Sequence, residues 1–128
     1  MKRFALFLVI IALLVSVTAC GTSSKASKKG QSVAKQAVEV LDDYLDGIEN
    51  GKDAYEKLER LYDQMNYAGE YEGIKLTDEE KTDRFIHSYL LYAQIAVSND
   101  KFEGDAETYE KVIAERNRLA ALVGIKER

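Results

Sequence analysis

The sequence predicts an all-α protein, a small bundle of about four helices arranged as two αα-hairpins, after an apolar N-terminal helix and a flexible linker. Three observations carry this prediction. Apolar residues from position 33 onward recur at three- and four-residue steps, which places them on one face of a helix. The 128-residue chain contains no proline, and no alternating run is long enough to indicate a strand. About 95 residues follow the linker, which is enough for one hydrophobic core.

The chain opens on a short apolar segment. Lys2 and Arg3 precede an apolar run at residues 4–17, which is shorter than the roughly 20 residues that span a bilayer. A basic start, a short apolar run and small residues beyond it are typical of a secretory signal peptide, here residues 1–19. The run closes on a motif that resembles the lipobox of bacterial lipoproteins, Val17-Thr18-Ala19-Cys20.

This resemblance implies a modification of Cys20. In lipoproteins the motif is read by the processing enzymes, and the cysteine receives a thioether-linked diacylglycerol and becomes the first mature residue. Cys20 is the only cysteine, and an unpaired thiol in an exported protein needs an explanation. We therefore expect an extracytoplasmic protein held by lipid on the outer face of the cell membrane, with no cofactor besides that diacylglycerol. An uncleaved anchor and an ordinary signal peptide with an incidental cysteine are the alternatives.

The charges are divided along the chain. Residues 20–31 are expected to be the lipidated cysteine and a flexible polar linker, and residues 32–128 the helical domain. All 22 acidic residues lie beyond residue 30, together with 13 of the 18 basic ones, a net charge of −9. An acidic body repels phosphate backbones, which argues against nucleic-acid binding. The tyrosine-, lysine- and glutamate-rich body resembles small lipoproteins of Gram-positive bacteria more than outer-membrane proteins.

The first hairpin is predicted from two apolar stripes. Ser32 is the expected N-cap of the first helix and Asn50-Gly51 its stop. Asp53, with Glu56 three residues later, is expected to begin the second helix in a capping-box arrangement. The two stripes are Val33, Ala37, Val40, Leu41, Tyr44, Leu45 and Ile48, then Tyr55, Leu58, Leu61, Tyr62 and Met65.

The second hairpin begins at a capping box. Thr77 and Glu80 have the spacing of that motif, and a wide apolar face follows, which predicts the central helix of the bundle. Residues 99–104 are expected to form a polar turn. Asp105 then caps a last helix that ends at Gly124. The wide face consists of Phe85, Ile86, Tyr89, Leu90, Tyr92, Ala93, Ala96 and Val97.

Side chains that would identify a reaction are lacking. An EF-hand reading of residues 46–57 fails, because Ile48 and Lys57 stand where oxygen ligands are needed. Glu79, Asp83 and His87 stand at four-residue steps on the third predicted helix, so their side chains could form one column. Because the chain has one histidine and no available thiol, we interpret this column as an Asp–His pair and not as a metal site. We therefore expect that the protein is not an enzyme.

Tyrosine is abundant, with eight residues and no tryptophan. Six tyrosines follow the helical stripes and are expected at the edge of the core, with their hydroxyl groups in water. The other two lie in a glycine-containing connection at residues 66–76. We interpret that connection as a candidate partner-binding patch, because tyrosine suits a surface that is both apolar and hydrogen-bonding. Its residues are Tyr67, Glu70, Tyr71 and Glu72.

These observations favour a membrane-anchored, non-catalytic binding or accessory module for a protein, peptide or cell-envelope partner. The alternative is a small-molecule or metal-binding lipoprotein with its site inside the helical bundle. A ligand-dependent rise in melting temperature distinguishes the two, because tight binding of a small ligand stabilises a fold by mass action. Nothing in the pattern specifies an oligomeric state.

Overall fold

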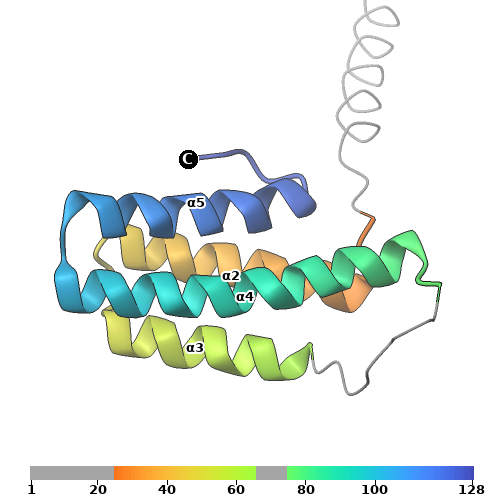
Figure 1. The fold of residues 1–128 in the computed structure, drawn as a ribbon, viewed down its shortest axis with the longest axis horizontal. Coiled ribbons are helices and arrows are strands. Elements are labelled where there is room, and N and C mark those ends of the chain that lie inside the picture. The colour runs from red at the N-terminus through yellow and green to blue at the C-terminus, as the bar shows by residue number, and fades with distance from the viewer. Residues whose placement is uncertain (1–24, 66–74) are drawn as a thin grey trace, which may run out of the picture.

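The computed structural model describes residues 25–65 and 75–128, which fold into four helices (Figure 1). They are α2 (Lys28–Leu45), α3 (Gly51–Gln64), α4 (Asp78–Glu103) and α5 (Ala106–Leu122). Helices α2 and α4 each pack against both α3 and α5 and touch one another less extensively. Consecutive helices run in opposite directions, which gives an up-down-up-down bundle. The described residues thus confirm the predicted small all-α bundle of two αα-hairpins.

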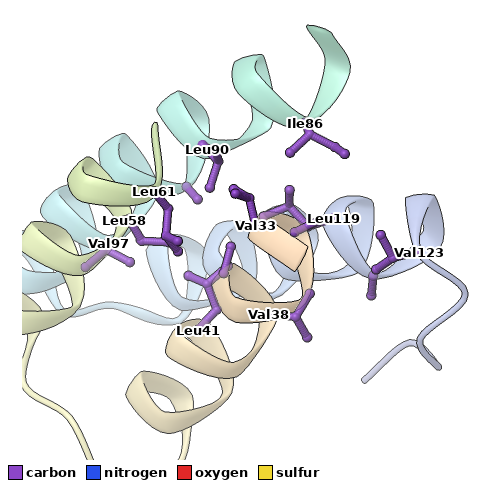
Figure 2. Packing of buried hydrophobic residues seen from close by; sticks show 14 of the residues in the cluster. Val33, Val38, Leu41, Leu58, Leu61, Ile86, Leu90, Val97, Leu119 and Val123 are labelled. Atoms are coloured by element: carbon purple, nitrogen blue, oxygen red, sulfur yellow. The ribbon is translucent and has the colours of Figure 1, made fainter. Parts of the chain in front are cut away.

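One hydrophobic core lies between the helices (Figure 2). Each helix contributes a leucine with no exposed surface: Leu41, Leu58, Leu90 and Leu119. Valines and alanines fill the spaces between these leucines. A fully buried leucine contributes about 1.5–3 kcal/mol to the folding free energy relative to an exposed one. The burial of these apolar side chains is therefore the main favourable term in folding. The predicted apolar stripes of the first hairpin account for much of the core.

The first helix begins earlier than predicted. The N-cap is Ser27 and not Ser32, because the Ser27 hydroxyl accepts a hydrogen bond from the Gly30 amide at 2.9 Å. Its own amide donates to Asp83 Oδ1 at 3.0 Å, and Ala26 is buried. The expected linker at residues 20–31 is therefore wrong from Ala26 onward, while residues 20–24 lie outside the described part. A contact between residues 56 positions apart is not visible in the local pattern.

Gly30 is needed where α2 approaches α4. A Cβ atom at this position would lie 2.2 Å from Asp83 Oδ1 and 3.3 Å from Ile86 Cδ1. Gly30→Ala would displace the carboxylate that holds the Ser27 amide. We expect a loss of about 1 kcal/mol of unfolding free energy, because the strain exceeds the gain in helix propensity. Urea unfolding followed by circular dichroism measures the change.

Gly51→Ala is the matched control for that substitution. Gly51 is also helical, but its Cβ atom would meet only the flexible Lys101 side chain, at 3.2–3.3 Å. We expect this variant to keep or slightly raise the unfolding free energy. Equal losses in the two variants would contradict the role given to the contact between Gly30 and Asp83.

In the turn between α2 and α3, the end of α2 and the N-cap of α3 differ from the prediction. Helix α2 ends at Leu45, and Gly47 follows with a φ of 73°, a left-handed conformation that glycine adopts without strain. Helix α3 is capped by Asn50, whose side chain accepts from the Asp53 amide at 3.0 Å, so Asp53 is not the cap. Ile48, predicted to lie on the apolar stripe, is consequently exposed beyond the helix end.

The caps of the second hairpin are confirmed, but its turn is shorter than predicted. The Thr77 hydroxyl accepts from the Glu80 amide at 3.2 Å, and the Thr77 amide donates to the Glu80 carboxylate at 2.7 Å. Helix α4 runs through residues 99–103 to Glu103, where a turn was expected, and Gly104 ends it with a φ of 62°. Asp105 caps α5 as predicted, and Gly124 follows that helix with a φ of 71°.

Candidate interaction surface

The structure does not place the predicted functional residues. The predicted lipobox at residues 17–20 lies outside residues 25–65 and 75–128. So does the predicted partner-binding patch of Tyr67, Glu70, Tyr71 and Glu72. The candidate surface described below is therefore built from other side chains.

The column on α4 is divided between structural contacts. Asp83 accepts a hydrogen bond from the Ser27 amide, as described above. The His87 ring stacks on Tyr62 of α3, with centroids 4.1 Å apart. Burial against this neighbour lowers the pKa of His87, because desolvation disfavours the charged imidazolium. Within the described residues, no three histidine, cysteine, aspartate or glutamate side chains gather as metal ligands.

Two of the six stripe tyrosines differ from the prediction. The Tyr44 hydroxyl donates to Asp100 Oδ2 at 2.5 Å, and the Tyr109 hydroxyl donates to the carbonyl of Leu45 at 3.2 Å. These hydroxyl groups therefore bond within the protein and do not simply reach water. Asp100 also accepts from Thr108 at 2.8 Å. Burial, together with the hydrogen bond and charge of Asp100, raises the pKa of Tyr44 above its ordinary value.

A polar cluster joins α2, α5 and the C-terminal segment. Arg116 is only 6% exposed and donates from Nε and Nη2 to the two carboxylate oxygens of Asp42, each at 2.9 Å. Its Nη1 donates to the carbonyl of Lys126 at 2.6 Å. Arg128 also binds Asp42, at 3.3 Å, and forms an ion pair with Asp46. The cluster holds the chain end against the bundle and so has a structural role.

The outward side of α4 exposes an apolar stripe, which we call the outer stripe. Thr82, Ile86, Leu90, Ala93 and Val97 occupy the inward side of the helix. At 100° per residue, the outer stripe lies opposite them. It consists of Phe85, Ser88, Leu91, Tyr92, Ile95, Asn99 and Phe102, and its apolar side chains are 41–81% exposed.

The outer stripe corrects the predicted wide apolar face. Phe85 and Tyr92 are predicted to share one wide apolar face with Ile86 and Leu90, but both are about half exposed, whereas Ile86 and Leu90 are buried. Helix α4 is thus apolar on two opposite sides, only one of which the bundle covers. In Figure 1, α4 lies between α5 and α3. The sequence signal that distinguishes the second side is the alternation of three- and four-residue steps from residue 85 to residue 102.

A surface groove of about 340 Å³ adjoins the C-terminal end of the outer stripe, between α3 and α4. Tyr55 and Phe102 supply aromatic surface, and the Lys101 ammonium lies 5.6 Å from the Phe102 ring centroid, within cation–π range. Charges of both signs surround these rings. Such a mixture of aromatic and charged groups suits a peptide or a polar chain with apolar side groups. The remaining lining residues are Gly51, Lys52, Glu56, Glu59 and Ser98.

Comparisons of the chain with protein-family models, curated proteins and solved structures find no match. A search of the described residues finds no helix with the length and hydrophobicity of a membrane span. The outer stripe and its adjoining groove are therefore interpreted from their chemistry alone.

Proposed function

We propose that this chain is a lipid-anchored lipoprotein on the outer face of the cell membrane, of the kind found in Gram-positive bacteria. We further propose that it acts as a non-catalytic binding or accessory module for a protein, peptide or cell-envelope partner. The lipobox at residues 17–20 supports the anchor. The observation that carries the binding role is the groove between α3 and α4, where Tyr55 and Phe102 lie among charges of both signs. Aromatic rings together with charged groups suit a partner that carries both apolar and polar groups.

Four aspartates of the described residues are engaged in structural contacts, which supports a non-catalytic role. Asp83 and Asp105 bind amides at helix starts, and Asp42 is paired with Arg116. Asp100 accepts from two hydroxyl groups, those of Tyr44 and Thr108. These groups already serve the fold, whereas the aromatic side chains of the groove are directed to its surface.

The early start of α2 limits how far a lipid anchor on Cys20 could lie from the bundle. Six peptide units separate Cys20 from the buried Ala26, so the two Cα atoms lie at most about 21 Å apart. Lys25, Lys28 and Lys29 are all exposed beside this point. Each lysine near an anionic surface is worth about 1 kcal/mol, which would favour this end of an otherwise acidic domain at the membrane.

Photo-crosslinking in the source cell tests the binding role. A photoreactive amino acid replaces Lys52, whose exposed side chain lines the groove, in the full-length chain. We expect one dominant adduct with an envelope component, because the groove would be covered in the complex. Mass spectrometry of the membrane fraction identifies the captured component.

The control places the same photoreactive residue at Lys35, an exposed position of α2 away from the groove. The dominant adduct should be absent there, and Phe102→Ala should reduce its yield at position 52. Equal capture from positions 52 and 35, or a yield that Phe102→Ala leaves unchanged, would contradict the assignment of the groove.

A further inference from the structure

The outer stripe has the spacing of a coiled-coil seam. Six of its residues follow one another at steps of 3, 4, 3, 4 and 3 positions: Phe85, Ser88, Tyr92, Ile95, Asn99 and Phe102. This 3.5-residue period is the one that keeps a seam facing a second helix. The core residues of α4 lie on the other side of the helix and already pack inside the bundle. The seam residues therefore do not contribute to the core of a single chain.

The residues of the outer stripe are themselves uncharged, although the Lys101 ammonium borders the stripe, 5.6 Å from the Phe102 ring centroid. The stripe's positions from residue 85 to residue 102 carry only aromatic, aliphatic, serine and asparagine side chains, although 31% of the chain's residues are charged. Depletion of charge with enrichment in aromatic residues is typical of the centre of a protein interface. If the second copy covered them completely, the exposed parts of the stripe's apolar side chains would contribute roughly 600 Å² per copy, the lower end of the ~600–1,000 Å² per partner of a specific interface.

The order of residues along the seam is self-complementary. When two copies of α4 lie antiparallel, Phe85 faces Phe102 of the second copy, Ser88 faces Asn99, and Tyr92 faces Ile95. The three pairs share one midpoint, between residues 93 and 94. The apolar residues then meet apolar residues, and the two polar side chains meet one another. A surface that matches itself about one axis is what a two-fold interface requires.

We propose that the outer stripe is a homodimer interface in which α4 packs antiparallel against α4 of a second copy. The residues that border the seam favour this direction. In a parallel pair Arg84 would lie opposite Arg84 of the second copy, whereas an antiparallel pair about the same midpoint places Arg84 opposite Glu103. Lys101 also borders the C-terminal end of the seam, beside the Phe102 ring.

The dimer has a consequence for the groove between α3 and α4. Phe102 belongs both to the seam and to the groove lining. Phe85 of the second copy would pack against Phe102 and add an aromatic ring at the edge of the groove. The inference rests on α4 alone and holds whether or not Cys20 carries lipid.

Disulfide trapping tests both the contact and its direction. Two tagged full-length chains are co-expressed, one with Phe85→Cys and the other with Phe102→Cys, and are exposed to a mild oxidant. We expect the mixed dimer to exceed either same-variant dimer at least about tenfold, because a disulfide needs Cα atoms within about 7 Å. A mixture of Phe85→Cys with Lys35→Cys provides the background. Same-variant dimers in excess, or mixed dimers at background level, would overturn the proposal.

Sedimentation of the full chain in detergent gives an independent measurement. The unaltered protein should sediment as a dimer, and Ile95→Glu should raise its dissociation constant by at least about tenfold, because a carboxylate would be buried at the centre of the seam. Ile95 is half exposed in one chain, so the melting curve of the bundle should be preserved. Gln36→Glu adds the same charge on exposed α2 surface and should leave the dimer intact. A monomeric unaltered protein, or equal effects of the two substitutions, would contradict the dimer.

Discussion

Cys20→Ser should abolish covalent lipidation of the protein and remove the mature form from the membrane fraction. The reason is that in the proposed lipoprotein the thioether would form on the cysteine sulfur, and the serine hydroxyl does not replace that thiolate as a nucleophile. Each buried methylene contributes about 0.8 kcal/mol, so one acyl chain binds only marginally and two hold a protein firmly. Metabolic labelling with an alkyne-bearing fatty acid, followed by the intact mass of the mature chain, measures the effect.

The control for this substitution is Ser23→Ala, which lies beyond the four lipobox residues. It should keep both the label and the processed N-terminus at Cys20. Membrane association alone is insufficient as a readout, because an unprocessed variant keeps the apolar run at residues 4–17. If the unaltered chain carries no label, or its mature N-terminus is not Cys20, the lipoprotein assignment is wrong.

Local patterns were sufficient to predict the helices and several of their caps. The Thr77 and Glu80 capping box, the Asp105 cap and the glycine stop at Gly124 use only residues within a few positions of one another. The boundaries that were wrong depend on distant residues. Ser27 was not recognised as a cap, because its amide is held by Asp83 and Gly30 allows α4 to approach.

The outer stripe illustrates a different limit of sequence reasoning. Periodicity shows that Phe85, Tyr92, Ile86 and Leu90 all lie on apolar parts of α4, but it does not show how much of the helix the bundle covers. Since α3 and α5 flank α4 on either side, only the inward half is buried. The coverage of a helix is a tertiary property, so the surface became visible only once the neighbouring helices were in place.

Arg116→Gln should be the most destabilising of the substitutions considered for the folded domain. It removes both hydrogen bonds to Asp42 and the bond to the Lys126 carbonyl. Breaking a buried ion pair costs about 3–5 kcal/mol. The lower end of this range applies to Arg116→Gln, because the Asp42 side chain is 31% exposed and keeps Arg128 as a partner. A loss of about 3 kcal/mol would lower the melting temperature of a domain of this size by roughly 10–20 °C.

Lys111→Gln is the control, since it removes one cation from an ion pair with Glu107 in which both side chains are more than half exposed. Such pairs contribute about 0.3–0.5 kcal/mol, so the melting temperature should change by only a few degrees. Comparable shifts in the two variants would show that Arg116 does not hold the α2, α5 and C-terminal segments together as the geometry indicates.

The pH dependence of unfolding isolates the charge of Asp42 from the packing around it. Burial raises the pKa of Asp42, but the hydrogen bonds and charges of Arg116 and Arg128 outweigh this effect and hold the pKa below its ordinary value. A carboxyl whose pKa is lowered on folding stabilises the fold above its unfolded pKa, near 3.9. That contribution is lost as the pH falls through the lower pKa of the folded state. Asp42→Asn should therefore be less stable than the unaltered protein at neutral pH, and the two should converge below about pH 4. If the difference in unfolding free energy between the two proteins stays constant below pH 4, Asp42 stabilises the fold through packing and not through its charge.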